Sequence, residues 1–306
     1  MLNKTAGQGA RRSRGDATVT KQQSIDHHYI PTFYLRRWTG TDRRICEFSR
    51  PYREVKPQRK GPKAAGFIPH LYTVSGMEPG LRSVLEDIVF KRTDQHANDA
   101  LAFMLANSDG TAEMPPKLRN GWSRFLMSLM HRGPEQLAAL KAKCQTTIEE
   151  HLAGLEYTCA KQRQPSDPET YAEMRAAVAH DVEHKAWALV LESAVDNPQV
   201  GTFINAMHWT IVTVRNPEWS ILTSDRPLHM TNGLDHAEAY IILPVGPTDI
   251  FIAVNTPGMV RRIAETEPRG LVKEINAKVV GQAVRYVYET DDAQLRFVEK
   301  RLCRRG

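Results

Sequence analysis

The sequence predicts an α+β fold, in which a helical middle section packs on a mainly antiparallel sheet formed by the N-terminal strands and the C-terminal third. Apolar residues recur at intervals of three and four through the middle of the chain, as they do in amphipathic helices. Short β-branched and aromatic runs bounded by turn residues follow residue 206. Helices and strands thus occupy separate parts of the chain, whereas a doubly wound parallel sheet requires them to alternate.

The N-terminal part combines a polar arm with the first structured elements. Residues 1–24 are basic and poor in apolar side chains, so we expect a disordered arm there. A single α+β domain over residues 25–306 should follow, with a division into sub-lobes near residue 205. The first elements of this domain are expected to be a short helix from Pro31 that ends before Gly40, a strand over 44–49, a loop over 57–66 and a strand over 67–74.

Periodicity and helix-breaking residues define the remaining elements. Asn197 and Pro198 should end the helical section, because the residue before a proline disfavours helical backbone. The predicted helices of the middle section cover residues 81–88, 118–129, 137–155 and about 168–195. The predicted elements of the last third are strands over 208–214, 219–224, 239–245 and 250–254, a helix over 268–283, a strand over 284–289 and a helix over 291–302.

Charge is distributed unevenly along the chain. Residues 1–60 carry 14 basic and 5 acidic side chains, whereas residues 61–299 carry 23 basic and 30 acidic side chains. This pattern disfavours a duplex-binding protein, which usually has a basic face on its folded part. We find no apolar stretch of 18 residues and no apolar secretion signal, so we expect a cytoplasmic protein without a membrane partner. The four cysteines show no C-x-x-C spacing and are expected to be reduced.

The segment from His27 to Trp38 reads His-His-Tyr-Ile-Pro-Thr-Phe-Tyr-Leu-Arg-Arg-Trp. It resembles the opening signature His-Tyr-Val-Pro-x-Phe-x-Leu-Arg-x-Phe of an uncharacterised bacterial family, a domain of unknown function. A later Thr-Ser-Asp-Arg-Pro at 223–227 resembles the family's Thr-Ser-Asp-x-Pro, with Arg226 where many members have Asn. The resemblance extends over about residues 26 to 290. It implies a shared fold and no assigned activity.

Polar residues at these motif positions form the first candidate site. His28 could act as a general acid or base, and Arg36 and Arg132 could clamp an anion such as phosphate. Asp225 follows a predicted strand and could orient His28 or bind a metal, and Ser224 beside it is a weaker candidate nucleophile because no G-x-S-x-G surrounds it. The alternative is a buried structural network in which Asp225 caps a turn.

Tyr72 and a histidine pair complete the candidate residues. Tyr72 lies in a motif segment and is predicted to contact the substrate. His180, Glu183 and His184 match H-x-x-E-H, which places two histidines one helical turn apart, as zinc ligation needs. No third ligand is evident downstream. Neither a P-loop nor G-x-G-x-x-G occurs, so the sequence identifies no cofactor.

Two functions are consistent with these residues. The first is an enzyme that acts on a phosphate-containing or other anionic substrate, such as a nuclease-like hydrolase. The second is a non-catalytic binding or interaction protein whose charged motif residues are structural. Its partner would be an anionic small molecule or nucleic acid, bound in part by the basic termini.

Overall fold

The computed structural model describes residues 26–72, 90–108, 112–162, 164, 167–168, 170–215, 219–231 and 233–303. Within its helices, the side chains of residues 152, 154–160, 177–185, 188 and 264 are outside this description. The predicted basic arm over 1–24 and the predicted helix over 81–88 also lie outside the described residues.

The described chain alternates short strands with helices at its start and end and is helical between them. The N-terminal part contains β1 (Asp26–His28), α1 (Thr32–Leu35), η1 (Arg36–Trp38), β2 (Ile45–Ser49), β3 (Lys56–Lys60), η2 (Pro62–Ala64) and β4 (Phe67–Pro69). The middle contains α3 (Arg92–Ala106), α4 (Pro116–His131), α5 (Pro134–Gln162), α6 (Tyr171–Val195) and α7 (Pro198–Ala206). The last third contains β5 (His208–Thr213), β6 (Thr223–Ser224), β7 (His229–Met230), β8 (Tyr240–Pro244), β9 (Asp249–Val254), α8 (Pro257–Ala264), α9 (Pro268–Gln282), β10 (Tyr286–Glu289) and α10 (Leu295–Glu299).

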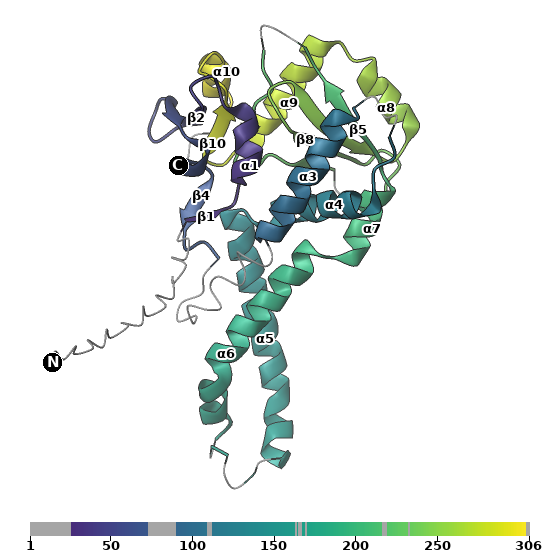
Figure 1. Cartoon of the computed structure of the whole chain (residues 1–306). Helices are drawn as coiled ribbons and strands as arrows, with labels where there is room; N and C mark the ends of the chain where they lie inside the picture. The colour runs from purple at the N-terminus through teal and green to yellow at the C-terminus, as the bar shows by residue number, and fades with distance from the viewer. Residues whose placement is uncertain are drawn as a thin grey trace, which may run out of the picture.

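One four-stranded sheet, in the order β5-β9-β8-β7, lies between two helical layers (Figure 1). Side chains alternate along β9, so Phe251 and Ala253 join the cluster that contains Trp122 of α4, with the rings of Phe251 and Trp122 5.3 Å apart. Ile250 and Ile252 join the cluster that α9 completes from the other face. The α+β class and the antiparallel pairing are therefore confirmed.

The strands are divided among three sheets instead of the one we predicted. The second four-stranded sheet, β3-β2-β10-β6, joins N-terminal strands to the C-terminal third, and β1 pairs with β4 alone. The loop predicted over 57–66 is wrong in its first part, because β3 pairs along the whole of β2. Pro57 is compatible with this pairing because β3 is an edge strand, where one lost backbone donor costs no ladder bond.

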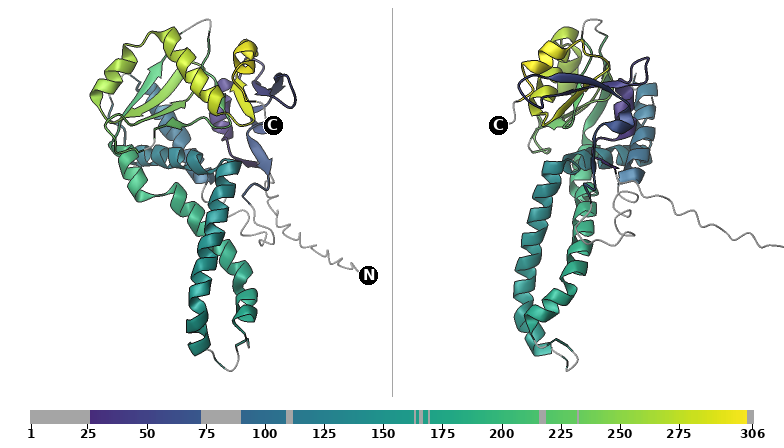
Figure 2. Two further views of the ribbon diagram at one scale, coloured as in Figure 1. Left: turned by 180° about the vertical axis from the view of Figure 1, so that it is seen from behind. Right: turned by 90° about the vertical axis from the view of Figure 1, so that its left-hand side faces the viewer.

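Helices α5 and α6 form a long antiparallel hairpin that projects from the sheets, as both views in Figure 2 show. At the base of the hairpin, Leu137, Trp187 and Leu191 are buried in a third cluster together with Tyr72 and Phe90. The hairpin thus packs on Tyr72 and on Phe90, which lies just before α3. Among the described helices, none has the length and apolar character needed to cross a bilayer.

Two side chains of the first helical turns, Tyr34 and Trp38, donate hydrogen bonds to backbone carbonyl oxygens of the last third of the chain. The hydroxyl of Tyr34 donates to the carbonyl oxygen of Pro244 at 2.6 Å, and the indole of Trp38 donates to that of Ile221 at 2.8 Å. Both side chains are fully buried, so the hydrogen bonds satisfy groups that would otherwise be costly to bury. These contacts fix the helical segment that follows β1 against the core.

A buried carboxyl group lies where β10 meets α9 and the segment after β10. Glu289 is 2% exposed, and its Oε1 accepts from the hydroxyl of Ser220 and the amide of Gln294, each at 2.7 Å. Asn276 of α9 extends the network by donating to the carbonyl oxygen of Ser220 and to Gln294 Oε1. Burial raises the pKa of Glu289 to about 7, against the opposing effect of these donors.

We expect the free energy of unfolding to fall as pH rises from about 4.5 to about 7. The variant Glu289→Gln should remove that loss. The raised pKa means that the folded state holds the proton more tightly, so the ionised form costs stability above about pH 4.5, increasingly up to pH 7. This increase in pKa corresponds to a loss of about 3 kcal/mol in the free energy of unfolding at pH 8. Urea denaturation at pH 4.5 and pH 8 should show Glu289→Gln close to wild type at the lower pH and clearly more stable at the higher. Equal stability of the two proteins at pH 8 would contradict this expectation.

Candidate functional site

His28 is at the end of β1 with its ring partly exposed. The ring nitrogen Nε2 lies 3.2 Å from the carbonyl oxygen of Lys63. A carbonyl oxygen only accepts, so Nε2 carries a proton and the neutral ring has Nδ1 as its free acceptor. Among the described residues Nδ1 has no hydrogen-bond partner. Lys63 thus orients a histidine whose other nitrogen is available for proton transfer.

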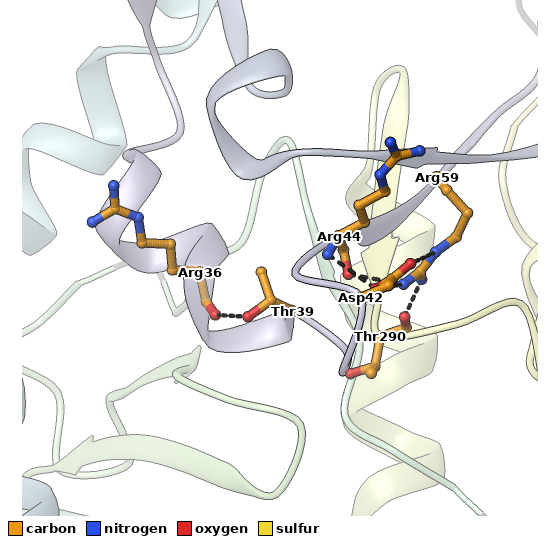
Figure 3. A network of polar contacts seen from close by, with 6 residues as sticks. All are labelled: Arg36, Thr39, Asp42, Arg44, Arg59 and Thr290. Carbon is orange, nitrogen blue, oxygen red and sulfur yellow. Dashed lines mark hydrogen bonds and ion pairs between the residues drawn. The ribbon is translucent and has the colours of Figure 1, made fainter.

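Arg36 follows α1 at the start of η1, and its backbone is fixed by Thr39. The Thr39 hydroxyl donates to the Arg36 carbonyl oxygen at 2.8 Å. Figure 3 shows the Arg36 guanidinium pointing away from the neighbouring network, in which Arg59 pairs with Asp42. The side chain is exposed and makes no ion pair or hydrogen bond with the described part of the chain. Its charge is therefore available to an anion.

One face of α3 and of the residues just before it completes a pocket with these two side chains. Lys91, Asp94, Gln95 and Asn98 recur at three- and four-residue spacing, which places them on one side of the helix. Together with His28, Thr32, Phe33, Arg36 and Phe90 they line a cavity of about 450 Å³. Asp94 is in the first turn of α3, where a negative charge is favourable for the helix.

Arg132 lies behind this pocket at the C-terminal end of α4. Its side chain is 1% exposed, and Nη2 pairs with Oδ1 of Asp94 at 2.9 Å. The guanidinium carbon stacks 4.5 Å from the centre of the Phe90 ring. The remaining donor nitrogens, Nε and Nη1, are buried and have no hydrogen-bond partner among the described residues. A buried guanidinium satisfied on one nitrogen only is rare in a purely structural ion pair.

The pocket carries an excess of positive charge. Burial raises the pKa of Asp94, while the Arg132 guanidinium and His28 oppose the increase. The Asp94 carboxylate is matched by Arg132, so Asp94 does not offset the positive charge of Arg36. This balance favours an anionic ligand.

Tyr72, predicted to bind substrate, is buried beside the pocket. Its hydroxyl donates to the backbone carbonyl of His28 at 3.1 Å, and its backbone N–H donates to Nδ1 of His27 at 3.0 Å. The ring also lies 4.5 Å from that of Phe90. The structure gives Tyr72 contacts that position β1 and the pocket wall.

Asp225 and Ser224 belong to a separate backbone network. The Asp225 carboxylate accepts from the backbone N–H groups of Val284, Arg285 and Tyr286 at 2.8, 2.5 and 3.1 Å. Ser224 Oγ accepts from the N–H of Arg226 at 3.2 Å. Neither residue lines the pocket or forms a hydrogen bond or ion pair with His28, Arg36 or Arg132. Burial raises the pKa of Asp225 against the lowering effect of its three donors.

The predicted metal ligands cannot be compared with this geometry. His180, Glu183 and His184 are on α6, but their side chains lie outside the described residues. Within the side chains that the structure describes, no group of three or more His, Cys, Asp or Glu could hold a metal ion.

The structure thus brings together His28 and Arg36 in one pocket and links Arg132 to it through Asp94. Sequence reasoning missed Asp94 and Lys91. The available signal was an acidic residue at the start of an alanine-rich periodic segment, Ala97, Ala100, Leu101 and Met104, all of which are buried on α3.

Comparison with known proteins gives a family and no further relative. A family model described as "Protein of unknown function (DUF4238)" matches residues 26–293. No curated protein and no solved structure is significantly similar to the chain. The match confirms the resemblance to a domain of unknown function, and it covers the pocket and all of its lining residues.

Proposed function

The chain belongs to the DUF4238 family. From the pocket, we propose that it is an enzyme acting on a phosphate-containing substrate. The observation that carries the proposal is the joint lining of one cavity by an oriented histidine, His28, and an unpaired guanidinium, Arg36. A guanidinium binds two oxygens of a phosphate group at once, and a histidine exchanges protons near neutral pH.

The chemistry that fits these groups is hydrolysis of a phosphate ester. Arg36 would hold the non-bridging oxygens of the phosphate group. His28 would take a proton from the attacking water through Nδ1 and return it to the leaving oxygen as the phosphorus–oxygen bond breaks. Asp94 would act through Arg132 and the pocket wall, not on the substrate.

We expect His28→Ala to lower kcat for bis(p-nitrophenyl) phosphate by about 100-fold, since a positioned acid or base contributes 10²–10⁴ in rate. Arg36→Gln should weaken the binding of inorganic phosphate at least about tenfold, measured by titration calorimetry on the full chain. The matched control is Arg44→Gln, because Arg44 is also exposed and does not line the pocket. Unchanged hydrolysis in His28→Ala together with unchanged phosphate affinity in Arg36→Gln would refute the proposal.

A non-catalytic anion-binding protein is the second candidate. It is favoured by the engagement of Asp225 and Ser224 in backbone hydrogen bonds, which leaves neither as an orienting carboxylate or a nucleophile in the pocket. The same measurements separate the two functions. Phosphate binding that depends on Arg36, with no turnover of mono- or diester substrates by wild type, would assign the pocket to binding alone.

A further inference from the structure

A second, larger cavity lies beside the turn that joins β2 to β3. Its volume is about 920 Å³, and it is bounded on the opposite side by the start of β10 and by Leu302 and Cys303. Figure 1 shows the neighbouring elements, β2 and β10, beside α10. None of its lining residues belongs to the pocket between α1 and α3.

Positive charge dominates this cavity without being neutralised. Arg50, Arg53, Lys56 and Arg285 line it together with one carboxylate, Glu54. No ion pair joins Glu54 to any of the four cations, and none of the four pairs with another acid in the described chain. Residues 61–299 carry an excess of acidic side chains, so acids are abundant elsewhere in the protein. Cations that lie close together without acidic partners repel one another, and a bound anionic ligand would relieve this repulsion.

The turn that carries Arg50 and Arg53 is held in place by hydrogen bonds. The Arg50 guanidinium donates to the carbonyl oxygen of Arg53 at 2.8 Å and to that of Glu299 at the end of α10. Carbonyl oxygens hold the guanidinium in place and leave its charge uncompensated. Its Nε is buried and has no hydrogen-bond partner among the described residues. Arg50 therefore ties the turn to α10 and adds fixed positive charge.

An aromatic ring is presented on the same turn. Tyr52 is 83% exposed, the most exposed of the large apolar side chains that the structure describes, and it lines the cavity beside the cations. Exposing such a ring to water on a braced turn is unfavourable unless a flat partner covers it. Proteins that bind single strands without sequence preference combine two components. Cations contact the phosphate backbone, and aromatic rings stack on the bases.

We propose that this cavity binds single-stranded nucleic acid, with a base stacked on Tyr52 and phosphates contacted by Arg53, Lys56 and Arg285. Stacking on an exposed ring requires an unpaired base, which a duplex does not offer. An acidic peptide or an anionic membrane would use the cations and leave the ring without a role. The site is independent of the proposed phosphate pocket, because the two share no residue.

The test is fluorescence anisotropy of a labelled twelve-nucleotide oligo-dT with the full chain at 50 mM salt. Tyr52→Ala should weaken binding about tenfold, whereas Tyr52→Phe keeps the ring and should bind within about twofold of wild type. The double variant Arg53→Gln/Lys56→Gln should lower the magnitude of the salt slope by about 1.4, because each neutralised phosphate of a single strand contributes about 0.7 to that slope. Arg261→Gln is the matched control, since Arg261 is an exposed cation on α8, away from the cavity.

Three results would overturn the proposal. Tyr52→Ala could bind oligo-dT as tightly as wild type, which would remove stacking. Arg261→Gln could weaken binding as much as Arg53→Gln/Lys56→Gln does, which would reduce the effect to net charge. Polyglutamate or phosphatidylserine vesicles could bind with a dependence on Arg53 and Lys56 while oligo-dT binding is unchanged in the double variant, which would assign the cavity to an acidic peptide or a membrane.

Discussion

Asp94→Ala should destabilise the protein by about 4 kcal/mol at pH 7, because it removes one partner of a buried ion pair. The Arg132 side chain is 1% exposed, and the bond to Asp94 is the hydrogen bond that its guanidinium makes. Its other nitrogens already have no partner among the described residues. Without Asp94 the charge remains buried against the ring of Phe90, with no acceptor in the described chain.

Urea denaturation of two further variants separates the loss of the pair from a general effect on α3. Asp99→Ala is the matched control on the same helix, because Asp99 is exposed and, among the described residues, its side chain accepts only from Gln95. This variant should change stability by less than about 0.5 kcal/mol. Adding Arg132→Met to Asp94→Ala should recover at least half of the loss, since an apolar pair of similar volume replaces an uncompensated charge. A double variant no more stable than Asp94→Ala would show that the pair is not the cause.

His28 and Arg36 could be predicted to lie together because they are close in sequence. They are eight positions apart, and a strand followed after three residues by a helical turn leaves little freedom in how the two side chains are placed. The apolar neighbours Tyr34 and Trp38 identify the face of this turn that packs on the core. The opposite face, which carries Arg36, then faces outward by helical geometry alone.

The partners from distant segments could not be predicted in the same way. Asp94 and Arg132 are 38 residues apart, and their pairing depends on how α3 packs against α4. Two of the five buried residues of α3 are alanines and one is a threonine, and these small side chains give a weak periodic signal in the sequence. The helix was therefore not predicted, and its acidic residue was not considered for the site.

Hydrogen bonds to backbone N–H groups explain the largest difference between the predicted site and the candidate pocket, which is that Asp225 does not line the pocket. Asp225 follows a strand, which suggested a side chain presented to a ligand. Its acceptors are occupied instead by N–H groups of residues 284–286, and a sequence does not reveal where backbone donors point. β10 starts at Tyr286 and not at Val284 as predicted, and the N–H groups of Val284 and Arg285 bond to this carboxylate instead of to a neighbouring strand.

Asp225→Ala should cost about 4 kcal/mol, because it removes three hydrogen bonds to a charged acceptor, each of which contributes more than about 1 kcal/mol. The carboxylate is 6% exposed, so water reaches the abandoned N–H groups poorly. These groups precede or begin β10, the strand that pairs with both β2 and β6. Thermal and urea denaturation at pH 7 should therefore show an unfolding transition shifted well below that of wild type.

Two neighbouring variants distinguish this acceptor role from the mere presence of a polar side chain. Asp225→Asn keeps one oxygen and turns an amide towards an N–H group, so it should lose about half as much stability as Asp225→Ala. Ser224→Ala removes one accepted hydrogen bond, from the N–H of Arg226, and should cost about 1 kcal/mol. If Asp225→Ala instead melts at or above the wild-type temperature, the Asp225 carboxylate destabilises the folded state. A ligand-binding role for Asp225 would then replace the structural one, since residues retained against stability are characteristic of functional sites.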